Sequence, residues 1–560
     1  MNSSMNLNHS TLSHLTSTPN YTTPETHEAK MRDIWSWICE LPNSEEWAES
    51  DSPLIFTLAS TKVRNQGDST RSIQLRAEHT SGSNSEALVT FSICFEGFQA
   101  SNSQKPLWVS DTCPLSSEQP FLPLVLQLLQ EIINRSPAVP DSTCPRSQLQ
   151  RLKTEPISWI MESHSPDSFS RFFNLVFLTR LFWLCACDAP SEVGSFYFHS
   201  LLGPNIEALT CKEAPVLRTF LVSVGVDTEL CFMRTLGYIL AKWIILREVS
   251  VGLQTLTPLP GQHLGISYAT EAHGFWTLKG YAPVNAMKLT HPSNPKSIFP
   301  AIGAKESLLR YALAHQQLEA VIQLEYSVGF YDGYIQVNAR VDNLRFHVAK
   351  LGFRKKEDDM DYFEERHFPS RIRVWVGPEV GSTYVYGLSL GRSTNNGESE
   401  IETQRLVKGS FGKLKNPQVK ARARVSLRNK MKNWRWDQDA EGNAAVFDAV
   451  LCDNVTGHEI ATWNSFNYGN GGKGDNSLQN RYYGVNRPFT KTGGLVFAGD
   501  DYGEQVAWRL SREMEGSVLK WRIGGEVWLS YLPNNVGTSY IETRCVEWCD
   551  EVDLPLITAT

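Results

Sequence analysis

The pattern that most constrains the fold is a change in the period of hydrophobic residues near position 250. Upstream of it, apolar residues recur at helical spacing in Leu124–Ile133, Phe172–Cys187 and Leu230–Glu248. Shorter upstream segments alternate as strands do: Leu54–Leu58, Ser72–Glu78 and Leu88–Phe95. Downstream, the apolar segments mostly follow the two-residue period of a strand. The first part of the chain is therefore predicted to mix helices and strands, and the second to be built of strands.

The second part is predicted to be antiparallel. Its strongest signal is a hairpin, in which Leu318–Phe330 alternates, Tyr331-Asp332-Gly333 turns, and Ile335–Ala339 alternates again. Further strands are predicted at Arg371–Val376, Thr383–Leu390, Gln418–Arg428, Ala445–Cys452, Glu459–Trp463, Gln505–Arg512, Ser517–Ile523, Glu526–Tyr531 and Tyr540–Trp548. A turn at Gly524-Gly525 is predicted between two of them. Many strands joined by short turns are typical of sandwiches and barrels. One large sandwich and two smaller ones both fit the pattern.

These patterns divide the chain into four segments. Residues 1–29 form a Ser/Thr/Asn-rich tail that is expected to be disordered, and residues 251–262 form a linker with two prolines and a glycine. The fold class expected is an α+β N-terminal domain over residues 30–250, followed by an all-β antiparallel sandwich/barrel-like C-terminal region over residues 263–555.

Composition and cysteine usage bound the class of protein. Of 560 residues, 41% are hydrophobic and 20% are charged, which excludes a wholly disordered chain, and the net charge of -7 excludes a basic polymer binder. The eleven cysteines are scattered, and no basic, apolar leader opens the chain, so we expect a reducing intracellular compartment and no secretion. Charges interrupt the apolar segments Phe172–Ala186 and Phe220–Val249, so no transmembrane segment is expected.

Four motifs match a known pattern but lack its context. Gly387–Gly391 fits G-x-S-x-G within a predicted strand, and Gly469–Gly474 fits G-x-G-x-x-G without a following helix. Asp437–Asp448 resembles a Ca²⁺ loop but lacks its final bidentate Glu. The close cysteine pairs, Cys185/Cys187 and Cys545/Cys549, have no partner ligands for zinc. We therefore predict no catalytic residue, no metal and no cofactor.

One charged segment departs from the acidic balance of the chain. Between Arg405 and Arg435 there are eleven Lys or Arg residues and no Asp or Glu. Within Val419–Arg428, aliphatic residues alternate with polar ones, most of them cations. Because a strand sends successive side chains to opposite faces, this segment is predicted to place its cations on one face. The cations are Lys420, Arg422, Arg424 and Arg428.

A second predicted strand has a related pattern. Arg371, Arg373 and Trp375 alternate with aliphatic residues, and Arg435 lies between two tryptophans. Guanidinium groups bind oxyanions through two hydrogen bonds, and indoles stack or lie at membrane interfaces. If the two strands adjoin, they form a basic sheet face for an anionic partner, either a phospholipid headgroup or a nucleic acid. The candidate residues are Lys420, Arg422, Arg424, Arg428, Arg371, Arg373, Trp375 and Arg435.

Other interpretations stay open. The acidic run Glu357–Glu365 can neutralise such a face within the fold, and cations on outer strands also discourage aggregation. An enzyme with a site in the cleft between the two domains is one alternative function. A glycan-binding sandwich with exposed tryptophans is another. The function expected from the sequence is a binding or scaffold protein without catalysis.

Two segments carry a resemblance to other proteins. Phe368–Ser393 and Gly525–Leu554 resemble plant proteins of a family without an assigned function. The resemblance implies a plant source and assigns no chemistry to any residue.

Overall fold

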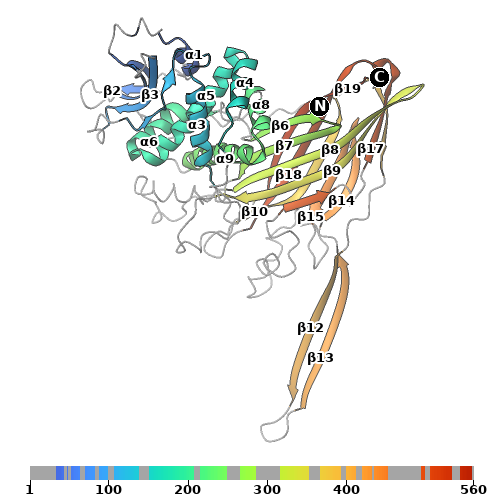
Figure 1. Ribbon diagram of the computed structural model, residues 1–560. Coiled ribbons are helices and arrows are strands. Elements are labelled where there is room, and N and C mark those ends of the chain that lie inside the picture. Colours follow the sequence, from blue (N-terminus) through green and yellow to red (C-terminus); the bar gives the residue numbers. More distant parts are fainter. Residues whose placement is uncertain are drawn as a thin grey trace, which may run out of the picture.

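Figure 1 shows a computed structural model of the chain, in which helices and a small sheet lie beside a large strand region. The structure describes residues 33–42, 47, 52–62, 70–81, 87–98, 106–137, 151–206, 215–248, 265–284, 316–351, 366–391, 399–411, 419–431, 434–451, 494–498, 505–532 and 543–557. The predicted tail, the predicted linker and the predicted strand Glu459–Trp463 lie outside these residues.

The N-terminal region packs helices against one antiparallel sheet. The sheet has the order β1-β2-β3-β4, and β5 also pairs with β3. Its strands are β1 (Leu54–Lys62), β2 (Thr70–Ser81), β3 (Ala87–Glu96), β4 (Trp108–Val109) and β5 (Cys113–Pro114). The helical elements are α1 (Ile34–Cys39), α3 (Leu122–Asn134), α4 (Thr154–Ser163), α5 (Pro166–Trp183), η2 (Leu184–Asp188), α6 (Ser191–Tyr197), η3 (Phe198–Leu202), α8 (Pro215–Ser223) and α9 (Val226–Glu248). The predicted mixture of helices and strands is confirmed.

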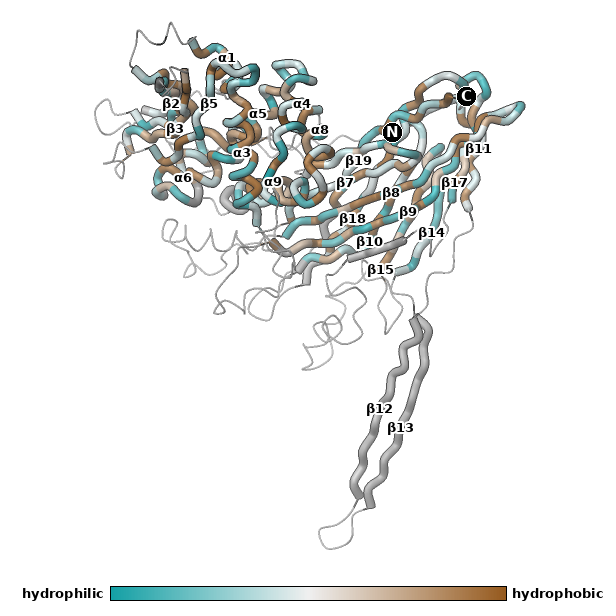
Figure 2. Tube along the Cα trace, in the orientation of Figure 1, coloured by the Kyte–Doolittle hydropathy of each residue, from teal (hydrophilic) through white to brown (hydrophobic). Residues whose placement is uncertain are grey.

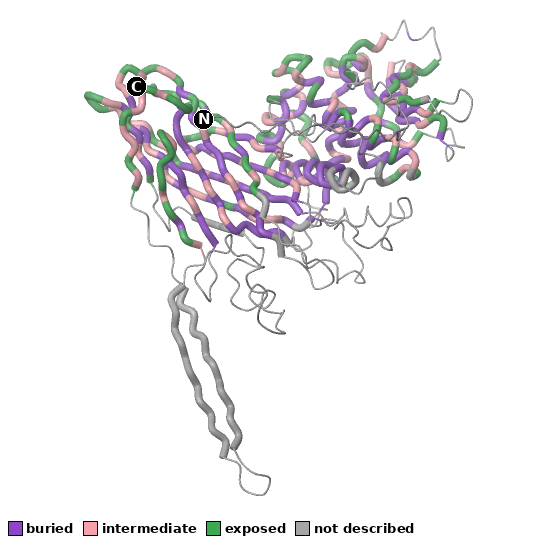
Figure 3. Tube along the Cα trace, turned by 180° about the vertical axis from the view of Figure 1, so that it is seen from behind, coloured by how far each residue is buried: buried purple, intermediate pink, exposed green. Residues whose placement is uncertain are grey.

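Helix α5 lies at the centre of this region. Every residue from Leu175 to Trp183 is buried, so the helix has no solvent-facing side along that stretch. Figure 2 shows the hydrophobic colouring of the helices, and Figure 3 shows their burial. A helix that is buried on every side belongs in the core of a large domain, and the polar Thr179 and Arg180 are buried along with the apolar residues. Among the described helices, none is long and apolar enough to cross a membrane.

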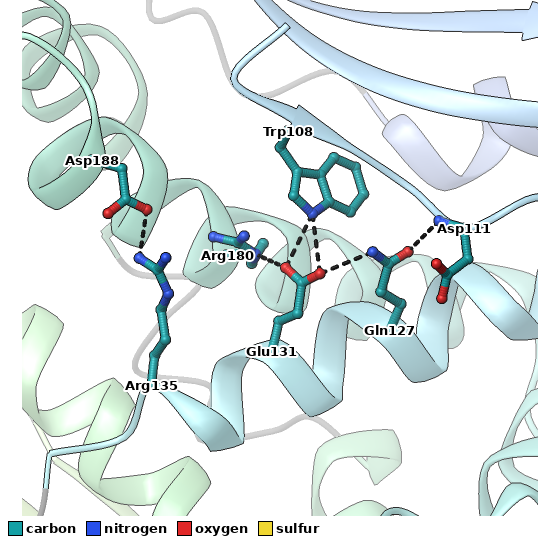
Figure 4. Close-up of polar contacts among 7 residues, drawn as sticks. All are labelled: Trp108, Asp111, Gln127, Glu131, Arg135, Arg180 and Asp188. Atoms are coloured by element: carbon teal, nitrogen blue, oxygen red, sulfur yellow. Dashed lines mark hydrogen bonds and ion pairs between the residues drawn. The ribbon is translucent and has the colours of Figure 1, made fainter.

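An ion pair between the buried Arg180 of α5 and the half-buried Glu131 of α3 joins the two helices inside the same region. The carboxylate of Glu131 accepts hydrogen bonds from the Arg180 guanidinium, from Trp108 Nε1 at 3.0 Å and from Gln127 at 2.9 Å (Figure 4). Burial lowers the pKa of Arg180, and the charge of Glu131 opposes that shift. Because Trp108 belongs to β4, this one carboxylate connects the sheet to two helices.

The C-terminal region is a sandwich of two antiparallel sheets. The five-stranded sheet has the order β14-β15-β10-β18-β19, and the seven-stranded sheet has the order β11-β17-β9-β8-β7-β6, with β16 pairing β9. The first sheet contains β10 (Arg366–Pro378), β14 (Trp434–Glu441), β15 (Ala444–Leu451), β18 (Val518–Leu532) and β19 (Thr543–Pro555). The second contains β6 (Ile266–Ala272), β7 (Phe275–Val284), β8 (Gln316–Phe330), β9 (Tyr334–Lys350), β11 (Val385–Leu390), β16 (Gly494–Ala498) and β17 (Gln505–Ser511), and η7 (Arg512–Met514) follows β17.

The two sheets enclose one shared core. Trp521 on the five-stranded sheet has its ring 5.1 Å from the ring of Trp508 and 5.7 Å from that of Trp276, both on the seven-stranded sheet. All three indoles are fully buried. The predicted antiparallel sandwich is therefore confirmed, and the described residues of its two sheets share one core.

The predicted turn at Gly524-Gly525 is wrong. Both glycines lie inside the continuous strand β18, where Gly524 is paired with Trp375 of β10. A Cβ on Gly524 would lie 2.2 Å from Cε2 of that indole. Glycine is therefore present to admit a large ring against the backbone, which is a second reason for glycine in a strand besides turning.

Helix α9 covers one end of the outer face of the seven-stranded sheet. Residues of even number in β8, such as Ile322, belong to the sandwich core, whereas Gln317 and Glu319 face the helix. The approach is close, because a Cβ on Gly237 of α9 would lie 2.0 Å from Oε1 of Gln317. The N-terminal hydrophobic cluster also takes in Tyr268 from β6. The two regions of the chain are thus joined by direct packing.

Two buried carboxylates secure this docking from opposite sides. Glu229 of α9 accepts hydrogen bonds from Lys279 Nζ at 2.7 Å, from Tyr281 at 2.7 Å and from Tyr268. Burial, reinforced by the charge of Glu229, raises the pKa of both tyrosines, which stay neutral donors.

The second carboxylate points the other way, from the sheet to the helix. Glu319 of β8 is bound by Arg234 of α9 through two nitrogens, at 2.8 and 3.2 Å, and by His347 Nε2 at 2.8 Å. Burial by itself would raise the pKa of Glu319, but His347 and Arg234 outweigh burial and hold this pKa below its usual value.

We predict that Glu131→Gln lowers the free energy of unfolding by about 3 kcal/mol, because it leaves the buried guanidinium of Arg180 without its counter-charge. The double variant Glu131→Gln/Arg180→Met should recover a large part of that loss. Denaturant titration of both variants tests this, with the exposed Glu118→Gln as control. Equal losses in the single and double variants would contradict the prediction.

We predict that Glu319→Gln also costs about 3 kcal/mol at neutral pH. Because the folded pKa of Glu319 lies below its unfolded value, its stabilisation is present above the unfolded pKa of about 4.3 and is lost as pH falls through the folded pKa. The difference between parent and variant should therefore shrink in acid. Thermal unfolding across pH measures it, and the exposed Glu325→Gln on the same strand is the matched control.

Candidate functional site

The predicted basic strand lies in a two-stranded ribbon. β12 (Ser399–Phe411) pairs with β13 (Val419–Met431) in antiparallel register, and these two strands form a sheet of their own. In Figure 1 the ribbon projects away from the sandwich. It is inserted between β11 and β14, which are edge strands of different sheets. The prediction that residues 419–428 run extended is confirmed.

The register assigns the residues of the ribbon to two faces. Residues that lie directly opposite share a face, and Val407 is opposite Ala423. The face of odd-numbered residues therefore contains Ser399, Ile401, Thr403, Arg405, Val407, Gly409, Phe411, Val419, Ala421, Ala423, Val425, Leu427, Asn429 and Met431. In the half of the ribbon far from the sandwich, formed by residues 406–411 and 419–424 and here called the tip half, this face has only apolar residues and glycine.

The face of even-numbered residues is polar apart from Leu406, and its charge is uneven. Near the sandwich, Glu402 lies opposite Arg428 and Glu400 lies opposite Lys430, so the cations there are matched by acids. In the tip half, the same face contains Lys408, Lys420, Arg422 and Arg424 and no acid. Lys408 lies directly opposite Arg422, and like charges in that position destabilise a strand pair.

The remaining predicted residues lie elsewhere. Arg371, Arg373 and Trp375 are on β10, which pairs with β15 and β18, and Arg435 is on β14. None of these strands pairs with β13 in the described part of the chain, so the condition that the two basic strands adjoin is not met. The prediction that β10 and β13 together form a single basic face is therefore wrong.

The outer face of the five-stranded sheet is acidic rather than basic around β10. Arg373 lies in a row of directly opposite residues that runs across all five strands: Asp437, Asp448, Arg373, Glu526 and Glu547. Arg373 also pairs with Glu441, and Arg371 donates to Asp448 at 2.9 Å. Strand order brings these acids to the arginines, and strand order was not predicted from the sequence.

The other members of the set are also engaged. Arg435 contacts Asp437 at 3.3 Å, and the guanidinium of Arg371 lies 5.0 Å from the ring of Trp528. Trp375 is half-buried against Gly524. These residues hold the outer face of the sheet together, so the candidate site contracts to the ribbon.

The motifs that lacked context fit the structure as ordinary elements where it describes them. Gly387–Leu390 form the last four residues of strand β11, and Asp437–Asp448 lies in the β14–β15 hairpin. No group of three or more metal-ligating side chains occurs among the described residues. Cys185 is a buried free thiol, and Cys545 and Cys549 are exposed free thiols. Gly469–Gly474 and the acidic run Glu357–Glu365 lie in segments that the structure does not describe.

Sequence reasoning missed strand β12. Its odd positions include Ile401, Val407 and Phe411, but Thr403 and Arg405 interrupt the apolar alternation. The signal becomes clear only when the strand is read beside its partner, because the apolar residues of β13 lie opposite those same positions.

Comparison with known proteins assigns no family. No family model matches the chain, and no curated protein matches it. Among solved structures, the membrane-inserted form of the NetB toxin and the delta-toxin, both of Clostridium perfringens, each match 52% of this chain at 10% identity and a TM-score of 0.19, over 95% and 96% of their own chains. A solved structure of a pore forming protein matches 52% of this chain and 88% of its own, at 8% identity and a TM-score of 0.16. Scores at this level leave fold and function to be argued from the chain itself.

We predict that Glu526→Gln raises the melting temperature at neutral pH. Burial raises the pKa of Glu526; Arg373 opposes this shift, and Glu547 adds to it. When the pKa of a carboxyl is higher in the folded protein than in the unfolded chain, ionising that carboxyl destabilises the fold. The free energy of unfolding therefore falls as pH rises from the unfolded pKa of about 4.3 towards the folded pKa.

The gain from Glu526→Gln should therefore be absent near pH 4 and appear as pH rises towards neutrality. Thermal unfolding measured along that pH series tests it, with the exposed Glu513→Gln as control. A variant less stable than the parent at neutral pH would contradict the interpretation.

Proposed function

We propose that this chain is a binding protein without catalytic activity that attaches to anionic phospholipid bilayers through the tip half of the β12–β13 ribbon. The observation that carries the proposal is the register, which places Lys408, Lys420, Arg422 and Arg424 on one face with no acid among them. Near a negatively charged bilayer each cation contributes about 1 kcal/mol, so four give about 4 kcal/mol. A binding free energy of this size attaches a single molecule only weakly, and dissolved salt screens the attraction.

Lipid is favoured over nucleic acid by the opposite face of the ribbon. Proteins that bind single-stranded nucleic acid combine cations with aromatic rings on which bases stack. The ribbon has one aromatic residue, Phe411, and its other tip residues on that face are small or aliphatic, such as Val407 and Ala421. An aliphatic surface beside a cationic one matches acyl chains beside phosphates, a combination that nucleic acid does not offer.

The alternative of an enzyme at the junction of the two regions gains no support from the described contacts. The buried carboxylates there, Glu229 and Glu319, are each satisfied by hydrogen-bond donors from the facing element. Their arrangement serves docking. The ribbon, by contrast, forms a sheet of its own and pairs with no other described strand.

The proposal predicts that Lys420→Glu/Arg422→Glu/Arg424→Glu lowers affinity for vesicles containing phosphatidylserine by more than about tenfold. The matched control is Arg151→Glu/Lys153→Glu/Arg171→Glu, which makes the same charge change at exposed positions of the N-terminal region and should bind as the parent does. Cosedimentation at low and at physiological salt measures both, with neutral phosphatidylcholine vesicles and a single-stranded RNA as parallel ligands.

Three results would overturn the proposal. The first is that the variant with three ribbon cations replaced by Glu binds the vesicles as tightly as the parent does. The second is that the control variant loses as much vesicle affinity as the ribbon variant does. The third is parental binding to RNA but not to anionic vesicles, which would assign the ribbon to nucleic acid. Circular dichroism of each variant verifies that the fold is retained.

A further inference from the structure

The ribbon has an unusual combination of features for a segment in water. Its tip half has an apolar face, and β12 and β13 pair only with each other among the described strands. An isolated two-stranded hairpin is marginally stable, and its outer edges present rows of backbone donors and acceptors that can accept another strand. The geometry of the ribbon therefore calls for a further strand at its edges.

We infer that the partner of those edges is the ribbon of another copy of this chain, and that anionic lipid triggers the pairing. This inference rests on the function proposed above. Copies join edge to edge through their ribbons on the bilayer surface, and the joined sheet turns its apolar face towards the acyl chains.

Charge explains why lipid is needed. The tip half of each ribbon carries Lys408, Lys420, Arg422 and Arg424, and Lys408 already lies opposite Arg422 within one ribbon. Bringing two such ribbons together in water adds repulsion between like charges, which is how natural edge strands avoid pairing. Anionic headgroups supply counter-charges and remove that barrier. The same cations thus attract the chain to anionic lipid and prevent its ribbons from pairing in solution.

The bilayer also makes pairing obligatory. An unpaired backbone amide or carbonyl group is very costly in hydrocarbon, so a lone ribbon cannot lower its edges into the acyl layer. Edge-to-edge pairing satisfies these groups at each edge that is joined, and it does so without requiring any particular side chain. The apolar tip residues, among them Val407, Ala421 and Ala423, can then leave water together.

The length of the tip half limits how deeply a joined sheet can enter the membrane. Each strand of the ribbon has 13 residues, which at about 3.3 Å per residue gives roughly 43 Å. The tip half of each strand covers about 20 Å on the same scale. On the apolar face, Arg405 is the one charged position, and it lies next to the tip half on the side of the sandwich. That position sets the depth, because the guanidinium belongs at the level of the headgroups.

The test uses the full-length protein with phosphatidylserine vesicles loaded with a self-quenching dye. The parent should give amine-crosslinked multimers with these vesicles and only monomers without them, and it should release dye. Ala423→Asp places a carboxylate on the apolar tip face and should still bind the vesicles but lose release by more than tenfold. Ser426→Asp introduces the same group on the polar face, three residues along the same strand, and should keep both.

Mixing parent and Ala423→Asp at a fixed parental concentration tests assembly directly. If ribbons work together, added variant lowers release below the level of parent alone, because mixed sheets are impaired. Release that stays at the parental level, or crosslinking that gives only monomers on vesicles, would overturn the inference while leaving lipid binding intact. Failure of the parent to bind phosphatidylserine vesicles at all would instead overturn the proposed function.

Discussion

The docking of α9 onto the seven-stranded sheet is the interaction on which the arrangement of the molecule depends. Apolar contact alone holds a helix to a sheet without fixing its position along the strands. Here Glu229 reaches from the helix to donors on β6 and β7, and Glu319 reaches from β8 to a guanidinium on the helix. Each carboxylate is buried, so any sliding of the helix would leave a charge without its partner in a medium of low dielectric constant. The two ion pairs therefore fix the position of the helix along the strands, and with it the position of the N-terminal core on the sandwich.

The β12–β13 ribbon takes no part in the pairing of either large sheet among the described strands. The seven-stranded sheet has one face in the sandwich core and part of the other beneath α9, while the five-stranded sheet uses its outer face for a lattice of acids and arginines around Arg373. The β12–β13 ribbon connects edge strands of the two sheets, and among the described strands it pairs with neither sheet. A connection between β11 and β14 needs only a short loop, so thirteen paired residues on each side of the connection are a surplus that the fold does not explain.

The sequence predicts the elements better than their neighbours. Period alone identifies the α3 and α9 helices, the β8–β9 hairpin and the extended course of β13, because periodicity is a local property. It misreads Gly524, since a glycine that admits an indole looks the same in sequence as a glycine that turns. Period also wrongly groups Arg371 and Arg373 of β10 with the cations of β13, because both strands alternate cations with aliphatic residues. Which acids lie beside those arginines depends on strand order, and strand order is set by packing across the whole sandwich rather than by any segment of the chain.

Strand order also separates charge in space, and this separation bears on how the molecule meets a charged surface. The acids of the five-stranded sheet, Asp437, Asp448, Glu526 and Glu547, surround one arginine, while the acid-free cations of the chain's most basic segment lie on the tip half of the ribbon. An anionic bilayer attracts the second group and repels the first, and both forces act within about 10 Å of the surface. These opposed forces turn the molecule so that the ribbon faces the bilayer and the acidic five-stranded sheet faces away from it. Net charge therefore says little about partners here: a chain of charge -7 can present a cationic end, because its acids are concentrated elsewhere.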